Sequence, residues 1–155
     1  MPRGDARLSL FVPGTPAPQG SKVAMLSRST GRPMMMETKA CRGNLNAWRA
    51  AVAWNAQQAM NGNPLKYEGA VHLVCTFTFI RPKSHLTTKG ALRKGKPFGK
   101  TTKPDLSKLI RAVEDALTDA GVWRDDSQVV EYAVSKRFGD IEGAQITVCD
   151  WEPGE

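Results

Sequence analysis

Apolar and polar residues alternate in several short segments of the chain, which is the pattern of β-strands with one buried face. The clearest case is Ala70 to Ile80, in which every second residue is apolar over most of the segment. Shorter segments of the same character are residues 8–12, 128–138 and 144–149. A proline or glycine lies within two residues of one end of each segment, so we expect four strands.

Two longer segments carry apolar residues at the three- and four-residue spacing of an amphipathic helix. The first is Asn44 to Met60, and Gly62 and Pro64 follow it closely. The second is Leu106 to Ala120, and the next residue is a glycine, which is favoured directly after a helix. The apolar stripe of the second helix consists of Leu106, Leu109, Ile110, Val113, Ala116 and Leu117.

The predicted elements follow the order β, α, β, α, β, β, without an internal repeat or a second apolar unit. Residues 13–22 and 82–104 are rich in proline and glycine, so we expect them to be loops. Residues 23–39 are expected to be irregular or to form a weak hairpin. This order predicts an α+β fold with a single domain over residues 1–155, in which a mixed β-sheet packs against two main helices.

Composition supports an ordinary globular domain. The chain has 155 residues, of which 41% are hydrophobic and 24% are charged, close to globular averages. Three widely spaced cysteines form no CxxC pair, which argues against a zinc site, and Cys75 and Cys149 are expected to be buried. No apolar run approaches the ~20 residues of a membrane helix. Together with a start that lacks a signal-peptide core, these features predict a soluble protein of the cytoplasm.

Charge is distributed unevenly along the chain. The net charge is +7, and residues 81–103 hold eight Lys or Arg and no acid, so the remaining chain is nearly neutral. A basic segment on a near-neutral body favours a polyanion partner such as nucleic acid. Its proline and glycine content predicts a mobile loop at about residues 82–104, and loops of this length are usually functional or disordered. The plainer interpretation is a loop that charge keeps soluble.

Acidic residues flank the second helix at both ends. Asp105 precedes its first residue, and Asp125 and Asp126 lie in the turn between this helix and the strand that follows. If helix and strand pack side by side, we expect these carboxylates to meet. Clustered carboxylates repel one another unless a hard cation such as Mg²⁺ neutralises them. Each acid also has an ordinary structural explanation, because Asp is common at helix N-caps and in turns.

Two cations on the second helix extend this pattern. Lys108 and Arg111 lie on its polar side, away from the apolar stripe. Phosphodiester hydrolysis needs an activated water and neutralisation of charge on the phosphate. A basic residue close to a metal-binding acid suits that chemistry, although a solvated helix face would have the same composition.

The segment KPDLSKLIRAVEDALTDAGVWRDDSQVVEY resembles the signature of the RusA-type Holliday-junction resolvases, endodeoxyribonucleases that are common in phages and prophages. The opening FVPGTPAPQGSK resembles the first strand and Pro-rich loop of the same family. The resemblance implies a homodimer that cuts four-way DNA by paired symmetric nicks in recombination and repair, with Mg²⁺, or Mn²⁺ in its place, as cofactor. It assigns the metal to Asp105 and Asp126, with Asp125 as an assisting metal ligand. Arg111 occupies the position at which the family usually carries a lysine.

Ser107 departs from the family pattern, which has a second acid at this position. A neutral hydroxyl is a weaker Mg²⁺ ligand than a carboxylate, so the site loses one negative charge. Glu114 and Asp115, further along the helix, are candidates to compensate. The alternative function is therefore a branched-DNA-binding relative that no longer cuts.

The leading hypothesis is a Mg²⁺-dependent endonuclease with catalytic Asp105, Asp126 and Arg111. In this hypothesis the DNA backbone is bound by Lys83, Lys89, Arg93, Lys94, Lys96, Lys100 and Lys103. A restriction-type nuclease built from Asp105, Glu131 and Lys136 ranks lower, because Ala133 stands where an E-x-K motif needs its lysine. A small-molecule hydrolase ranks lowest, since neither histidine has a nucleophile at a suitable spacing.

Overall fold

The computed structural model describes residues 4–20, 22–27, 29–37, 39–63 and 67–154, without the side chains of 22–26 and 33–43. Its centre is a four-stranded sheet in the order β1-β6-β4-β5. The strands are β1 (Ala6–Pro13), β4 (Val71–Ile80), β5 (Val129–Gly139) and β6 (Gly143–Asp150). β6 runs antiparallel to both of its neighbours, whereas β4 and β5 are parallel, so the sheet is mixed.

Side chains alternate along β4, so one face of this strand packs into the core. Leu73, Cys75 and Phe77 are fully buried in the core, while Thr76 and Thr78 are half-buried. β5 forms one edge of the sheet and follows a weaker alternation. The four strands predicted from the apolar pattern are confirmed within two residues of their expected ends.

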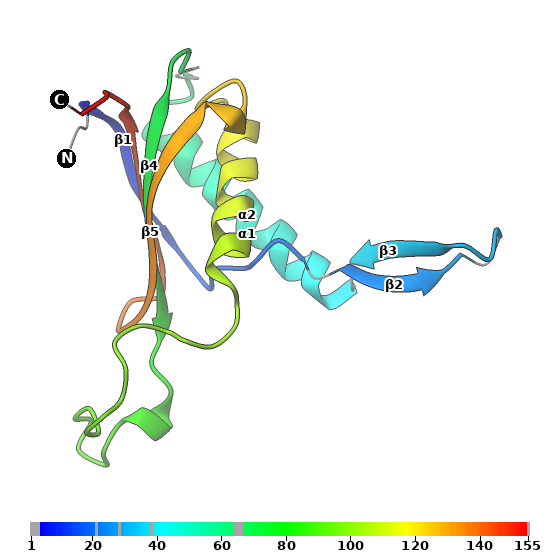
Figure 1. Cartoon of the computed structure of the whole chain (residues 1–155). Coiled ribbons are helices and arrows are strands. Elements are labelled where there is room, and N and C mark those ends of the chain that lie inside the picture. Colours follow the sequence, from blue (N-terminus) through cyan, green and yellow to red (C-terminus); the bar gives the residue numbers. More distant parts are fainter. Residues whose placement is uncertain (1–3, 21, 28, 38, 64–66, 155) are drawn as a thin grey trace.

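Two helices cover one face of this sheet (Figure 1). α1 (Lys39–Ala59) starts earlier than the predicted Asn44, and α2 (Leu106–Asp119) agrees closely with the predicted helix. The apolar stripe of α2 is buried, including Leu109, Val113 and Leu117. After α2 the chain turns at Gly121, whose φ of 83° suits a glycine. The predicted α+β fold, a single mixed-sheet domain with two main helices, is confirmed.

A two-stranded hairpin extends the structure beyond the predicted elements. β2 (Lys22–Leu26) pairs with β3 (Pro33–Glu37) in antiparallel register, and the hairpin projects away from the body (Figure 1). This segment was expected to be irregular or a weak hairpin, and the hairpin is what forms. The methionines of β3 lie outside the residues whose side chains are described.

The direction of α2 decides where the acids lie. α2 connects the parallel strands β4 and β5, so it must run back along the sheet in the opposite direction. Figure 1 shows α2 leading away from the long loop after β4, while β5 returns toward that loop. The start of α2 therefore lies beside the end of β5, and the end of α2 lies beside the start of β5.

Candidate functional site

Asp105 occupies the N-cap position of α2, and its carboxylate remains exposed. Its main-chain carbonyl accepts hydrogen bonds from Lys108 and Leu109, which begins the helix. The side chain makes no capping hydrogen bond and instead lies 3.8 Å from the Lys108 ammonium, measured between Oδ2 and Nζ. The N-cap explanation therefore accounts for the position of Asp105 but not for its carboxylate, which is accessible to a ligand.

Asp125 and Asp126 differ in their surroundings. The Oδ1 atom of Asp125 accepts a hydrogen bond of 2.7 Å from the Ser127 amide, and Gln128 Oε1 accepts from the Asp125 amide. This capping box begins the short 3₁₀ helix η2 (Asp126–Gln128). Hydrogen bonds from Ser127, and then one with the Asp126 side chain, lower the pKa of Asp125. Asp125 is thus a turn residue, and the exposed Asp126 carboxylate lies beside it.

Asp126 lies near two acids in the second half of α2. Glu114 is nearly buried and accepts a short hydrogen bond from the Tyr132 hydroxyl on β5. Burial raises the pKa of Glu114, and the charges of Asp126 and Asp115 raise it further, against the opposing effects of Tyr132 and Arg111. The pKa of Asp115 is also raised, first by burial and then by Asp126. Both candidates for compensating Ser107 therefore feel the charge of Asp126, and whether they compensate for it stays a prediction.

Asp105 and Asp126 do not meet within one chain, which corrects the expectation that the acids at both ends of the segment converge. The helix rise places Glu114 about 13.5 Å along α2 from Asp105, and Asp126 lies beside Glu114. α2 and β5 do pack side by side, but they run in opposite directions. Among the residues that the structure describes, no group of three or more His, Cys, Asp or Glu is arranged to hold a metal ion.

Arg111 lies between the two groups of acids. It is exposed on α2, four residues after Ser107 and four before Asp115, so all three share one helix face. Its charge lowers the pKa of both Glu114 and Asp115. Ser107 is exposed in the first turn, two residues after Asp105.

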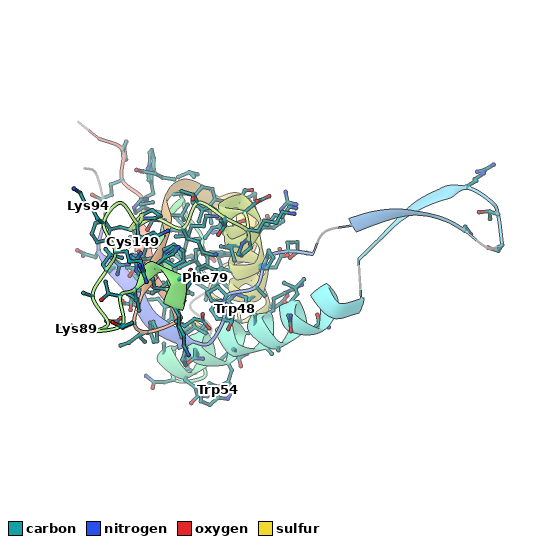
Figure 2. All side chains as sticks on the ribbon, turned by 90° about the horizontal axis from the view of Figure 1, so that it is seen from below. Trp48, Trp54, Phe79, Lys89, Lys94 and Cys149 are labelled. Carbon is teal, nitrogen blue, oxygen red and sulfur yellow. The ribbon has the colours of Figure 1, made fainter. Side chains whose placement is uncertain are left out.

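The basic loop, residues 81–104, projects beyond the ends of β4 and β5 (Figure 1). Its tip is organised by backbone hydrogen bonds, among them Arg93 N to His85 O at 2.8 Å. Lys89 and Lys94 lie on the side of the molecule opposite the β2–β3 hairpin (Figure 2). The exposed cations of the predicted set are Lys83, Lys89, Arg93, Lys94 and Lys103, while Lys96 and Lys100 are half-buried. Mobility of the loop stays a prediction.

Aromatic rings anchor the base of this loop to the sheet. The Arg81 guanidinium lies 5.0 Å from the ring centroid of Phe138 and donates to the Pro97 carbonyl at 2.7 Å. The Phe138 amide donates to the Phe98 carbonyl. On the other side of the loop, the Lys136 ammonium donates to the carbonyls of Thr102 and Pro104 at 2.7 Å each. The residues that lead into Asp105 are therefore held against β5.

Glu114, Tyr132 and Lys136 are the residues whose positions the sequence did not reveal. Glu114 gave one usable signal, since it falls within the apolar stripe of α2, four residues after Ile110 and three before Leu117. A charged residue at such a position is buried with a partner or turned to a site. Lys136 was considered only for a restriction-type site, and the structure instead bonds its ammonium to main-chain carbonyls.

Other predictions concern the rest of the chain. Cys75 and Cys149 are buried, as expected, and burial raises the pKa of the Cys75 thiol. The side chain of Cys41 lies outside the described residues. Within the described part of the chain, no helix has the length and apolar character to cross a membrane.

Comparison with known proteins identifies a family and one relative that this chain resembles. Residues 13–149 match the family described as Endodeoxyribonuclease RusA. A segment of 68 residues is 34% identical to the uncharacterized protein YqaN of Bacillus subtilis (strain 168). That segment covers 44% of this chain and 43% of the relative, so the likeness spans less than half of either protein.

Proposed function

Because the chain belongs to the RusA endodeoxyribonuclease family, we propose that it is a structure-selective endonuclease that resolves Holliday junctions by paired symmetric nicks. The observation that carries the proposal is Asp105, an exposed carboxylate without a capping role at the base of a loop rich in lysine. That loop supplies the charge to bind the phosphate backbone of the arms. We expect the protein to act in the cytoplasm, and its phage setting stays a prediction.

Mg²⁺ fits the chemistry of the acids but not their distribution within one chain. Carboxylates are the ligands that Mg²⁺ prefers, yet Asp105 and Asp126 lie at different ends of α2 and the described residues form no three-acid site. We therefore propose that the metal lies between two copies of the chain. When bound, Mg²⁺ or Mn²⁺ would activate water and neutralise charge on the phosphate.

A two-fold axis beside the edge strand β5 would bring the separated acids together. In an antiparallel pair of β5 strands, the start of one strand lies beside the end of the other. Asp126 precedes the start of β5, and Asp105 lies beside its end, so each copy would complete the site of the other. Val130 and Tyr132 expose about half of their side chains on this strand, at 54% and 47%. Of the tryptophans on α1, Trp48 is buried and unavailable for an interface, while Trp54 is exposed.

Each residue then has a distinct role in the proposed site. Asp105 of one copy and Asp126 of the other hold the metal, and Asp125 shapes the turn that presents Asp126. Arg111 carries a guanidinium group, which is not a proton donor in proteins, so its role is to stabilise negative charge on the phosphate. Two equivalent sites related by the axis suit two symmetric cuts.

Mixed dimers test whether the site is shared. Asp105→Asn and Asp126→Asn are each expected to abolish nicking and to retain junction binding. If the site is shared, a heterodimer of the two variants contains one site with both acids intact and one with neither. Co-refolded variants should then nick one strand of each junction. An inactive mixture would contradict the shared site, because acids that act within one chain cannot be restored by mixing.

Cleavage itself is tested with a labelled four-way junction and a matched linear duplex, in Mg²⁺, Mn²⁺ or EDTA. We expect paired symmetric nicks in the junction, none in the duplex, and none with EDTA. Junction binding without any nick in either metal would replace the proposal with the non-catalytic alternative. The Asp5→Asn variant is the matched control, since Asp5 is an exposed acid before β1 and outside the proposed site, and it should retain full activity.

A further inference from the structure

A pocket of about 770 Å³ opens between the Pro-rich loop after β1, helix α1 and the segment that leads into α2. Its walls are mostly apolar. Pro16 and Ala17 form one side, and Ala51 on α1 another. The aromatic residues Trp48 and Phe79, labelled in Figure 2, also line it. Both aromatic side chains are nearly buried, at 4% and 6% exposure, so the walls belong to the rigid core.

Two lysines of the basic loop stand at this pocket. Lys100 and Lys103 line it together with the apolar residues. The Lys100 ammonium lies 5.3 Å from the ring centroids of both Phe79 and Phe138 and donates to the Thr102 hydroxyl at 2.8 Å. Its position is therefore set by the fold, which lowers the entropy lost when it binds an anion.

The pocket lies beside the acid assigned to metal binding. Pro104 lines it and directly precedes Asp105. The Pro-rich loop is tied to the first turn of α2, since the Gln19 amide donates to the Lys108 carbonyl at 3.0 Å. A ligand in the pocket would thus lie next to Asp105, the acid that we propose binds the metal at the scissile phosphate.

We propose that this pocket receives one unstacked nucleobase from the branch point of the DNA, with the flanking phosphates on Lys100 and Lys103. The inference rests on the proposed function and adds to it a basis for choosing branched DNA. A base has two flat apolar faces and suits apolar and aromatic walls. Bases at a branch point leave the stack at a lower cost than bases within a duplex. A linear duplex would therefore bind through the lysines of the loop without filling the pocket.

Filling the pocket from α1 tests this assignment without a change of charge. Ala47 lines the pocket at the surface of α1, whereas Ala50 is exposed on the same helix and does not line it. Ala47→Phe is the test variant and Ala50→Phe the matched control, with circular dichroism to verify that both fold. Binding is measured in EDTA to a four-way junction, to the same junction with abasic sites at the branch point, and to a linear duplex.

We expect Ala47→Phe to bind the intact junction about tenfold more weakly than the wild type, the size of one lost base-stacking contact. On the abasic junction and on the duplex the two proteins should bind equally, and Ala50→Phe should match the wild type throughout. Equal binding of Ala47→Phe and wild type to the intact junction would overturn the assignment. So would an equal loss on the abasic junction, since the added ring would then obstruct the DNA path rather than a base.

Failure of the proposed function gives a different result. A wild-type protein without preference for the four-way junction over the duplex would refute the function and the inference together. A wild-type protein that prefers and nicks the junction, combined with an unaffected Ala47→Phe variant, would refute only the base pocket.

Discussion

The ammonium of Lys136 on β5 donates a hydrogen bond to the main-chain carbonyl of Pro104, with 2.7 Å between nitrogen and oxygen. A second bond of the same length goes to the Thr102 carbonyl. Together they fasten the end of the basic loop to the sheet directly before Asp105. The same strand carries Tyr132, whose hydroxyl donates a hydrogen bond to Glu114 on α2. β5 therefore contacts α2 in its second half and the chain directly before its first residue.

Lys136→Met should slow cutting more than it weakens binding. Hydrogen bonds to a charged group are worth about 1.5–3 kcal/mol, and their loss would release the segment that positions Asp105. A misplacement of about 1 Å at a reacting group costs on the order of 100-fold in rate. Single-turnover nicking of a junction should fall by roughly that factor, with junction affinity in EDTA within about threefold. Arg137→Met, an exposed cation one residue away, is the control, and an equal rate loss there would contradict the positioning role.

Glu114→Gln should stabilise the protein at neutral pH. Burial raises the pKa of Glu114 above its ordinary value of 4.5, so ionising this carboxyl costs more in the folded state than in the unfolded state. Stability contributed by this group is full below pH 4.5 and is lost as pH rises through the folded pKa. Glutamine keeps an acceptor for Tyr132 and carries no charge. In urea unfolding, the variant should have a higher free energy of unfolding than the wild type at pH 7.5, and the two proteins should have equal values at pH 4. A variant that is less stable at pH 7.5 would show that the ionised carboxylate is favoured in place.

Ser107→Asp should lower the metal concentration that nicking requires. The added carboxylate lies on the first turn of α2 beside Asp105 and restores the acid that the family pattern contains. We expect the Mg²⁺ concentration for half-maximal nicking to fall about tenfold. Asp is also favoured near a helix N-terminus, worth about 0.3–1 kcal/mol, so the unfolding midpoint should rise slightly. Ser107→Asn has the same shape without the charge and should do neither. A metal requirement that does not change would place residue 107 outside the metal site.

Lys89→Gln with Lys94→Gln should weaken binding to every DNA form alike. Both lysines are exposed on the basic loop, where phosphate contacts carry no sequence information. Each lost phosphate contact makes the slope of log affinity against log salt less steep by about 0.9. The slope of the double variant should therefore be smaller in magnitude by roughly 1.8. Arg7→Gln removes a cation that pairs with Asp150 instead and should leave the slope unchanged. An unchanged slope in the lysine variant would place the backbone contact elsewhere.

The sequence alone determined the local structure of this protein. Period-two alternation identified the four strands of the main sheet, and the apolar stripe with Gly121 located α2, because these patterns report which face of an element is buried. Asp105 and Asp126 stood out as acids that flank one helix, and their role at the site stays a prediction. The basic loop was equally plain from its lysines.

Only the tertiary structure decided how these parts meet. A helix between two parallel strands has to run antiparallel to them, so the acids that frame α2 in the sequence lie at separate ends of it in one chain. Periodicity carries no information on strand order, and the pairing of β4 with β5 arises from packing of the whole sheet. The same packing buries Glu114 against Tyr132, bonds Lys136 before Asp105, and encloses the pocket between α1 and the Pro-rich loop, since each of these contacts joins residues distant in the chain.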